Sequence, residues 1–150
     1  MTATRDAPPG RAMRKGLQVV LALFGAAAII ISLLHIALGP AAIPGSVPVN
    51  ATMDSEDRFY ATLFLAYGAS LLWCVRDVER KASVVYCLML TFFMGGLARL
   101  VSVLAVGPPN TFFIVMTGLE LMLPIVLGYM QLRVSERGRG DVGGADELVN

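Results

Sequence analysis

The sequence has few charged residues for its length. Only 15% of its 150 residues are charged, whereas 56% are hydrophobic. A soluble globular domain carries charge on about a quarter of its residues. The composition therefore favours an integral membrane protein over a soluble domain. No run of basic residues with interleaved aromatics is present, so the sequence does not favour nucleic-acid binding.

Residues that bind metals or form disulfides are also scarce. The chain has one histidine and two cysteines, Cys74 and Cys87, which flank a short basic segment. We place this segment in the cytosol, where thiols stay reduced, and one histidine with two separated cysteines does not make a zinc site. The sequence also lacks a nucleotide-binding loop and a nucleophile elbow. It thus predicts no metal, no cofactor and no catalytic residue, and it favours a protein that is not an enzyme.

Four apolar segments are long enough to cross a bilayer. A spanning helix needs about 20 mostly apolar residues, and backbone in lipid must satisfy its own hydrogen bonds. We predict helices at residues 17–39, 59–75, 82–106 and 111–132, and the second helix has room to begin near Asp54. The first segment is longer than the ~7–15-residue apolar region of a signal peptide, so we expect it to remain as a span.

Ten of the twelve Lys and Arg residues fall on one side of the predicted membrane. They lie in residues 1–16, 76–81 and 133–139, whereas the connections 40–57 and 107–110 contain none. The positive-inside rule makes the basic side cytoplasmic. The prediction is an all-α antiparallel four-helix bundle in the plasma membrane, with both termini in the cytoplasm. Its membrane domain covers residues 17–132. We expect the basic N-terminal tail (1–16) and the C-terminal tail (133–150) both to be disordered.

Each predicted helix carries a row of small or polar residues at helical spacing. Helices in lipid associate through small residues and interhelical hydrogen bonds, so we expect these rows to face inward. In chain order the four rows are Gly25, Ala28, Ser32, His35 and Gly39; Tyr60, Leu63, Tyr67, Ser70 and Cys74; Thr91, Gly95, Arg99 and Ser102, with Gly96 beside them; and Thr117, Glu120, Pro124 and Gln131.

An arginine and a glutamate lie inside the third and fourth spans. Ionisable residues within a bilayer are costly and are therefore functional candidates. At about 1.5 Å per residue, Arg99 and Glu120 lie roughly 10 Å and 14 Å from the outer ends of their helices, so we expect an ion pair. Pro124 removes the N–H that would bond the Glu120 carbonyl. We expect a kink there and a second acceptor for Arg99.

Four further side chains are predicted in the same outer half: His35, Arg58, Tyr60 and Tyr67. Together with Arg99 and Glu120 they are the candidate ligand-binding or partner-binding residues. We expect them to line a cavity that opens outward under the 40–57 connection. Alternatives remain open, because Arg58 and Tyr60 also fit interfacial anchors and His35 also fits an ordinary hydrogen-bonding role.

The segments RFYATLFLAYG (58–68), GGLARLVSV (95–103), GPP (107–109) and LELMLP (119–124) resemble a family of small four-span bacterial membrane proteins with a domain of unknown function. The resemblance covers about residues 17–132. It implies a four-helix bundle in which positions 58, 99 and 120 are family features, and it implies no activity. A looser likeness is to DoxX-like proteins, some of which are linked to quinone or redox modules.

Three functions stay open at this point. The first is a non-enzymatic bundle that binds a lipid-like or small amphipathic ligand, or a partner membrane protein, through the outer polar residues. The second is a small proton-coupled carrier in which Glu120 alternates between protonated and Arg-paired states. The third is a redox accessory protein that uses His35, Tyr67 and Glu120. The lipid bilayer is the partner that the composition itself indicates, and a homo-oligomer is an open alternative.

Overall fold

A computed structural model of the chain describes the backbone of residues 9–146 and the side chains of residues 11–136. Within this range the chain forms four α-helices, one short 3₁₀ helix and no strand. The elements are α1 (Pro9–Leu38), η1 (Gly39–Ala42), α2 (Ala51–Val75), α3 (Ala82–Val106) and α4 (Thr111–Asp146). All four α-helices are long and apolar enough to span a membrane. The prediction of an all-helical chain with four such helices is confirmed.

The observed helix limits differ from the predicted ones at the start of α1, the start of α2 and the end of α4. The limits of α3 and the start of α4 agree with the prediction. In contrast, α2 begins at Ala51 because the Asn50 side chain accepts a hydrogen bond from the Met53 N–H at 3.0 Å. Such an N-cap satisfies a backbone donor that has no partner inside the helix.

The helices also extend into the segments for which we expected disorder. Residues 9–16 belong to α1 and residues 133–146 belong to α4. Contacts with the rest of the bundle account for part of this extension. Arg14 lies 3.4 Å from Glu79, and Val134 is only 4% exposed. The disorder expected for residues 1–8 and 147–150 concerns residues outside the described range.

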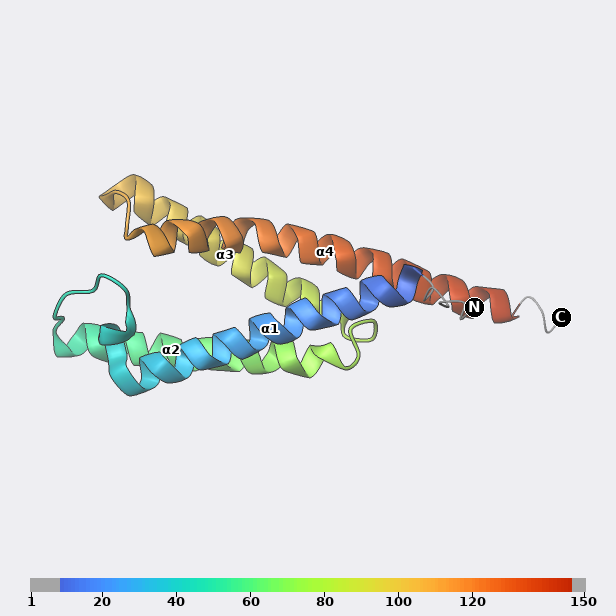
Figure 1. Cartoon of the computed structure of the whole chain (residues 1–150), viewed down its shortest axis with the longest axis horizontal. Helices are drawn as coiled ribbons and strands as arrows, with labels where there is room; N and C mark the ends of the chain where they lie inside the picture. Colours follow the sequence, from blue (N-terminus) through green and yellow to red (C-terminus); the bar gives the residue numbers. More distant parts are fainter. Residues whose placement is uncertain (1–8, 147–150) are drawn as a thin grey trace, which may run out of the picture.

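The four helices form two pairs (Figure 1). α1 packs along α2, and α3 packs along α4, whereas α2 and α3 share few contacts. The two pairs meet at the end of the molecule where α1 begins, and they diverge toward the connections that follow α1 and α3. We refer to α1 and α2 as the first pair and to α3 and α4 as the second pair.

A buried core joins the two pairs at the end where they meet. Its apolar members come from every helix and from the α2–α3 connection: Leu17, Leu21, Leu71, Cys74, Val78, Val85, Met89, Leu127 and Val134. Within it, the fully buried Gln131 donates a hydrogen bond to the Val78 carbonyl at 2.6 Å. Apolar packing and this polar contact therefore hold the second pair against the first.

The first pair approaches closely through two glycines. A Cβ atom on Gly25 would lie 2.9 Å from the carbonyl oxygen of Gly68, and a Cβ on Gly68 would lie 2.9 Å from that of Gly25. Real Cβ atoms essentially never show contacts under 3.0 Å. The absence of side chains at both positions is thus what allows the backbones to touch.

The predicted inward rows of α1 and α4 agree with the burial, whereas those of α2 and α3 agree only in part. Cys74 of the α2 row is fully buried, but other members of that row are exposed. In α2 the buried residues include Ala61, Gly68 and Leu71, whereas Tyr60 is 60% exposed and Leu63 is 54% exposed. The packing face lies one position later because the small residues that permit close approach are there. In α3, Gly96 is buried against α4, and a Cβ on Gly95 would meet nothing within 4 Å.

Candidate functional site

Four of the six predicted polar residues fall into two separate groups, one in each helix pair. The first group, which we call the loop-side cluster, comprises His35 at the end of α1 and Asp54, Asp57 and Arg58 at the start of α2. The second group is the Arg99–Glu120 pair between α3 and α4. The hydrogen bonds do not connect them, so the expected single cluster of outer polar residues is not what the structure contains.

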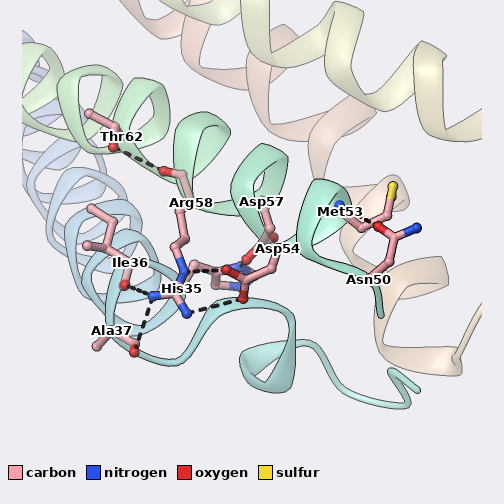
Figure 2. A network of polar contacts seen from close by, with 9 residues as sticks. All are labelled: His35, Ile36, Ala37, Asn50, Met53, Asp54, Asp57, Arg58 and Thr62. Carbon is pink, nitrogen blue, oxygen red and sulfur yellow. Dashed lines mark hydrogen bonds and ion pairs between the residues drawn. The ribbon is translucent and has the colours of Figure 1, made fainter. Parts of the chain in front are cut away.

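His35 pairs with a carboxylate across the first pair (Figure 2). Its Nδ1 lies 3.0 Å from one carboxylate oxygen of Asp57 and 3.1 Å from the other. Only 22% of the His35 side chain and 17% of the Asp57 side chain are exposed. The contact therefore fixes one nitrogen of the ring and ties the end of α1 to the first turns of α2.

Arg58 spans the same junction (Figure 2). Its Nε donates to Asp54 at 2.9 Å and its Nη2 donates to the other oxygen of this carboxylate at 3.2 Å. The Nη1 group donates to the carbonyls of Ile36 and Ala37. Carbonyls in the last turn of a helix have no partner within it, so the guanidinium caps the end of α1. Every nitrogen of Arg58 is engaged within the protein.

The two aspartates were not predicted as site residues. Asp54 lies in the first turn of α2, where an acidic residue is favoured by the helix dipole. The spacing of Asp54 and Arg58 by four residues was a usable sign of an ion pair on one helix face. The contact between His35 and Asp57 depends on how α1 and α2 align, and no local pattern reports this alignment.

Tyr67 lies between the two pairs, apart from both polar groups. Its hydroxyl donates to the Leu88 carbonyl of α3 at 2.9 Å. Its ring centroid lies 5.8 Å from that of Phe24 and 6.2 Å from that of Phe92, and the Phe24 and Phe92 centroids are 4.4 Å apart. Tyr67 thus belongs to an aromatic contact that bridges α1, α2 and α3. Tyr60 is 60% exposed and packs edge-on against Phe59.

The predicted ion pair of the second pair is confirmed. Arg99 Nε lies 2.9 Å from Oε1 and 2.8 Å from Oε2 of Glu120. The guanidinium also lies 5.2 Å from the ring centroid of Phe113. The expected second acceptor is not observed, because among the described residues Arg99 makes no hydrogen bond to the Glu120 main-chain carbonyl. Pro124 lies within α4, which continues through it.

The two partners differ in exposure and in how fully they are bonded. The Glu120 side chain is 10% exposed, whereas that of Arg99 is 43% exposed. Only Nε of Arg99 has a hydrogen-bond partner within the described part of the chain, which leaves Nη1 and Nη2 without one. A guanidinium has five N–H donors, of which these two groups carry four. Arg99 therefore presents unused donors on the outside of the helix pair.

The connection between α1 and α2 reaches across to the second pair. A Cβ on Gly45 would lie 3.1 Å from the side-chain nitrogen of Asn110, so the connection touches the start of α4. An open depression of about 750 Å³ lies beside it, lined by residues 46–51 together with Leu38, Pro40, Ala41 and Asp54. None of the six predicted binding residues lines this depression.

No group of three or more His, Cys, Asp or Glu side chains within the described range is arranged to hold a metal ion. Comparison with known proteins gives one match, to a family model described as domain of unknown function (DUF4345), over residues 16–131. No curated protein and no solved structure matches the chain. The looser likeness to DoxX-like proteins is therefore not confirmed. The matched segment includes both polar groups and every member of the buried core except Val134.

Proposed function

The chain belongs to the DUF4345 family, which brings no activity with it, and we propose that it is a non-enzymatic membrane bundle that binds a lipid-like amphipathic molecule through Arg99. Glu120 holds the arginine in place through Nε, and the ligand bonds to Nη1 and Nη2. The ligand has an apolar chain and a head group with oxygen acceptors.

We further propose that the bundle is antiparallel and lies in a bacterial plasma membrane with both termini in the cytoplasm. Contacts at the two ends of the first pair support the helix directions. Gln18, near the start of α1, donates to the Val75 carbonyl at 2.7 Å, and His35, near its end, contacts Asp57. The basic residues of segments 1–16, 76–81 and 133–139 support the orientation through the positive-inside rule.

The observation that carries the proposal is the half-exposed guanidinium of Arg99. It stands roughly 10 Å, at about 1.5 Å per residue, from the outer end of α3, within a helix apolar enough to span a membrane. A polar donor that faces hydrocarbon without an acceptor costs several kcal/mol, so these N–H groups need partners. Charge-assisted hydrogen bonds to a carboxylate or phosphate would supply them.

The surface next to Arg99 has room for such a molecule. Gly95 lies one helical turn before Arg99, and a Cβ at this position would meet nothing within 4 Å. Val106 lies two helical turns after Arg99 on the same face of α3, and its apolar side chain is 88% exposed. The head group would bond to Arg99 while its chain lies along this apolar surface.

The carrier and redox hypotheses receive less support. A carrier needs Glu120 to exchange partners, but both of its carboxylate oxygens lie within 2.9 Å of Arg99 Nε. The redox hypothesis joins His35, Tyr67 and Glu120, yet these three side chains bond to three different partners in different places. A partner membrane protein with a carboxylate at this depth remains the alternative ligand, and the experiment distinguishes it.

Mass spectrometry of the protein, gently extracted from membranes, tests the proposal. We expect an amphipathic small molecule on the wild type and on Arg80→Gln, a matched control at an exposed arginine outside the spans, and its loss from Arg99→Gln. Oleic acid and oleylamine serve as defined probes with the same chain length. Arg99→Gln should weaken the binding of oleic acid about 10-fold to 100-fold, the worth of one charge-assisted hydrogen bond. It should not weaken the binding of oleylamine, because an ammonium group accepts no hydrogen bond from a guanidinium.

Helix content and unfolding midpoint of each variant are measured in parallel. A folded Arg99→Gln protein that retains the same small molecules and oleic acid affinity contradicts the proposal. If Arg99→Gln instead loses a co-purifying protein and no small molecule, the ligand is a membrane partner and the lipid-like reading is wrong.

A further inference from the structure

A second candidate site lies at the other end of α2, away from both polar groups. An open depression of about 470 Å³ is lined by Leu72, Trp73, Arg76, Asp77 and Lys81. Two of these five residues are basic and one is acidic. The depression combines an apolar wall from the last turn of α2 with cations from the following connection.

Lys81 is fixed in this depression by the backbone and ring of Trp73. Its Nζ donates to the Trp73 carbonyl at 2.7 Å and lies 3.8 Å from the centroid of the indole ring. The carboxylate of Asp77 is farther away, at 3.8 Å, and 53% of the Asp77 side chain is exposed. The ammonium group is therefore positioned mainly by Trp73, and Asp77 offsets its charge only in part.

Arg76 supplies a second cation to the depression. It is exposed, and within the described part of the chain its side chain makes no hydrogen bond or ion pair. In contrast, the depression beside the α1–α2 connection has Asp54 as its single charged lining residue. The charge of the two depressions differs in sign, and only the one at the end of α2 favours an anion.

The level of the depression in the membrane follows from its apolar residues. Leu72 is 37% exposed and Trp73 is 58% exposed, and both belong to the last turn of a helix apolar enough to span a membrane. Tryptophan is enriched where hydrocarbon meets head groups. Arg76 and Lys81 then lie at head-group level, and Leu72 and Trp73 lie at the level of the first acyl carbons.

We propose that this depression binds an anionic phospholipid. The phosphate lies between Arg76 and Lys81, and the acyl chain runs along Leu72 and Trp73. Basic pockets beside membrane helices bind anionic head groups because the surface charge attracts them and the fixed cations hold them. The site is independent of the Arg99 ligand, and it requires only that α2 ends at a membrane surface.

Trp73 makes the proposal directly testable because it is the single tryptophan of the chain. The full chain is reconstituted in phosphatidylcholine bilayers that contain a small fraction of lipid brominated on the acyl chain. The brominated lipid is either phosphatidylglycerol or phosphatidylcholine, and each quenches Trp73 only from nearby. We expect brominated phosphatidylglycerol to quench Trp73 more strongly than brominated phosphatidylcholine does. Its association constant relative to phosphatidylcholine should be roughly fivefold higher for each cation that contributes.

Arg76→Gln should lower this preference roughly fivefold, whereas Arg80→Gln should leave it unchanged. The two arginines lie in the same connection, but Arg80 does not line the depression. Each variant is compared with its own unquenched fluorescence, and Lys81→Gln provides a second test at the same site. Equal quenching by the two lipids, or equal effects of Arg76→Gln and Arg80→Gln, would overturn the proposal.

Inorganic phosphate distinguishes a lipid from a free anion. We expect millimolar phosphate to reduce the preference no more than chloride does at the same ionic strength, because it lacks the acyl chain that contacts Leu72 and Trp73. If phosphate removes the preference where chloride does not, the site takes free phosphate and the lipid assignment is wrong.

Discussion

Placing a methyl group at Gly68 tests whether close backbone contact holds the first pair together. In Gly68→Ala the new Cβ would lie 2.9 Å from the Gly25 carbonyl oxygen and 3.0 Å from the Ala28 Cβ. Ordinary contacts of this kind begin near 3.4 Å, so α1 and α2 must separate by a few tenths of an ångström. Overpacking of this kind costs about 1–3 kcal/mol. We expect a loss of stability of this size, reduced by the higher helix propensity of alanine.

Gly118→Ala and Gly128→Ala are matched controls in α4. A Cβ at either position meets nothing within 4 Å, so only the helix propensity changes, and alanine is favoured by up to about 1 kcal/mol. Equilibrium unfolding in mixed detergent micelles, followed by Trp73 fluorescence, measures each variant. If Gly68→Ala is as stable as Gly118→Ala, the two helices do not depend on this contact and the reasoning is refuted.

Substitutions at three further positions are checked by the same unfolding assay. Asn50→Ala removes the N-cap bond to Met53 and should cost about 1 kcal/mol, whereas Asn50→Asp should retain stability. Tyr67→Phe loses the hydrogen bond to the Leu88 carbonyl and should cost about 0.5–1.5 kcal/mol; an unchanged midpoint would show that the ring packing alone joins α2 to α3. Gly39→Ala should cost about 1–3 kcal/mol because the residue has φ +61 and its Cβ would meet Asp54 and Arg58; a neutral effect would contradict the strain.

Sequence reasoning predicted the features that depend on depth along a helix. The four spans follow from the lengths of the apolar segments, and the Arg99–Glu120 contact follows from a short connection that places both residues at similar heights. The inward row of α4 is also right, because Thr117, Glu120 and Gln131 are polar groups that gain from facing other helices.

The face of α2 was mispredicted because polarity and size point in different directions there. Tyr60 and Tyr67 suggested an inward row, but a tyrosine also suits an exposed position near the membrane surface, and Tyr60 has this position. The packing face is instead marked by the small residues Ala61 and Gly68, of which Gly68 touches the backbone of Gly25. Where helices associate by close approach, small residues are the stronger indication of the interface.

The contacts between the two helix pairs could not be predicted, because they depend on how the pairs align. The bond from Gln131 to the Val78 carbonyl and the bond from Tyr67 to the Leu88 carbonyl each use a main-chain acceptor. Every residue has a main-chain carbonyl, so the identity of the accepting residue does not indicate which side chain bonds to it. By contrast, the carboxylates that bind Arg58 and Arg99 are chemically distinctive and can be searched for in a sequence. Polar contacts within each pair are therefore partly readable from the sequence, and those between the pairs require the structure.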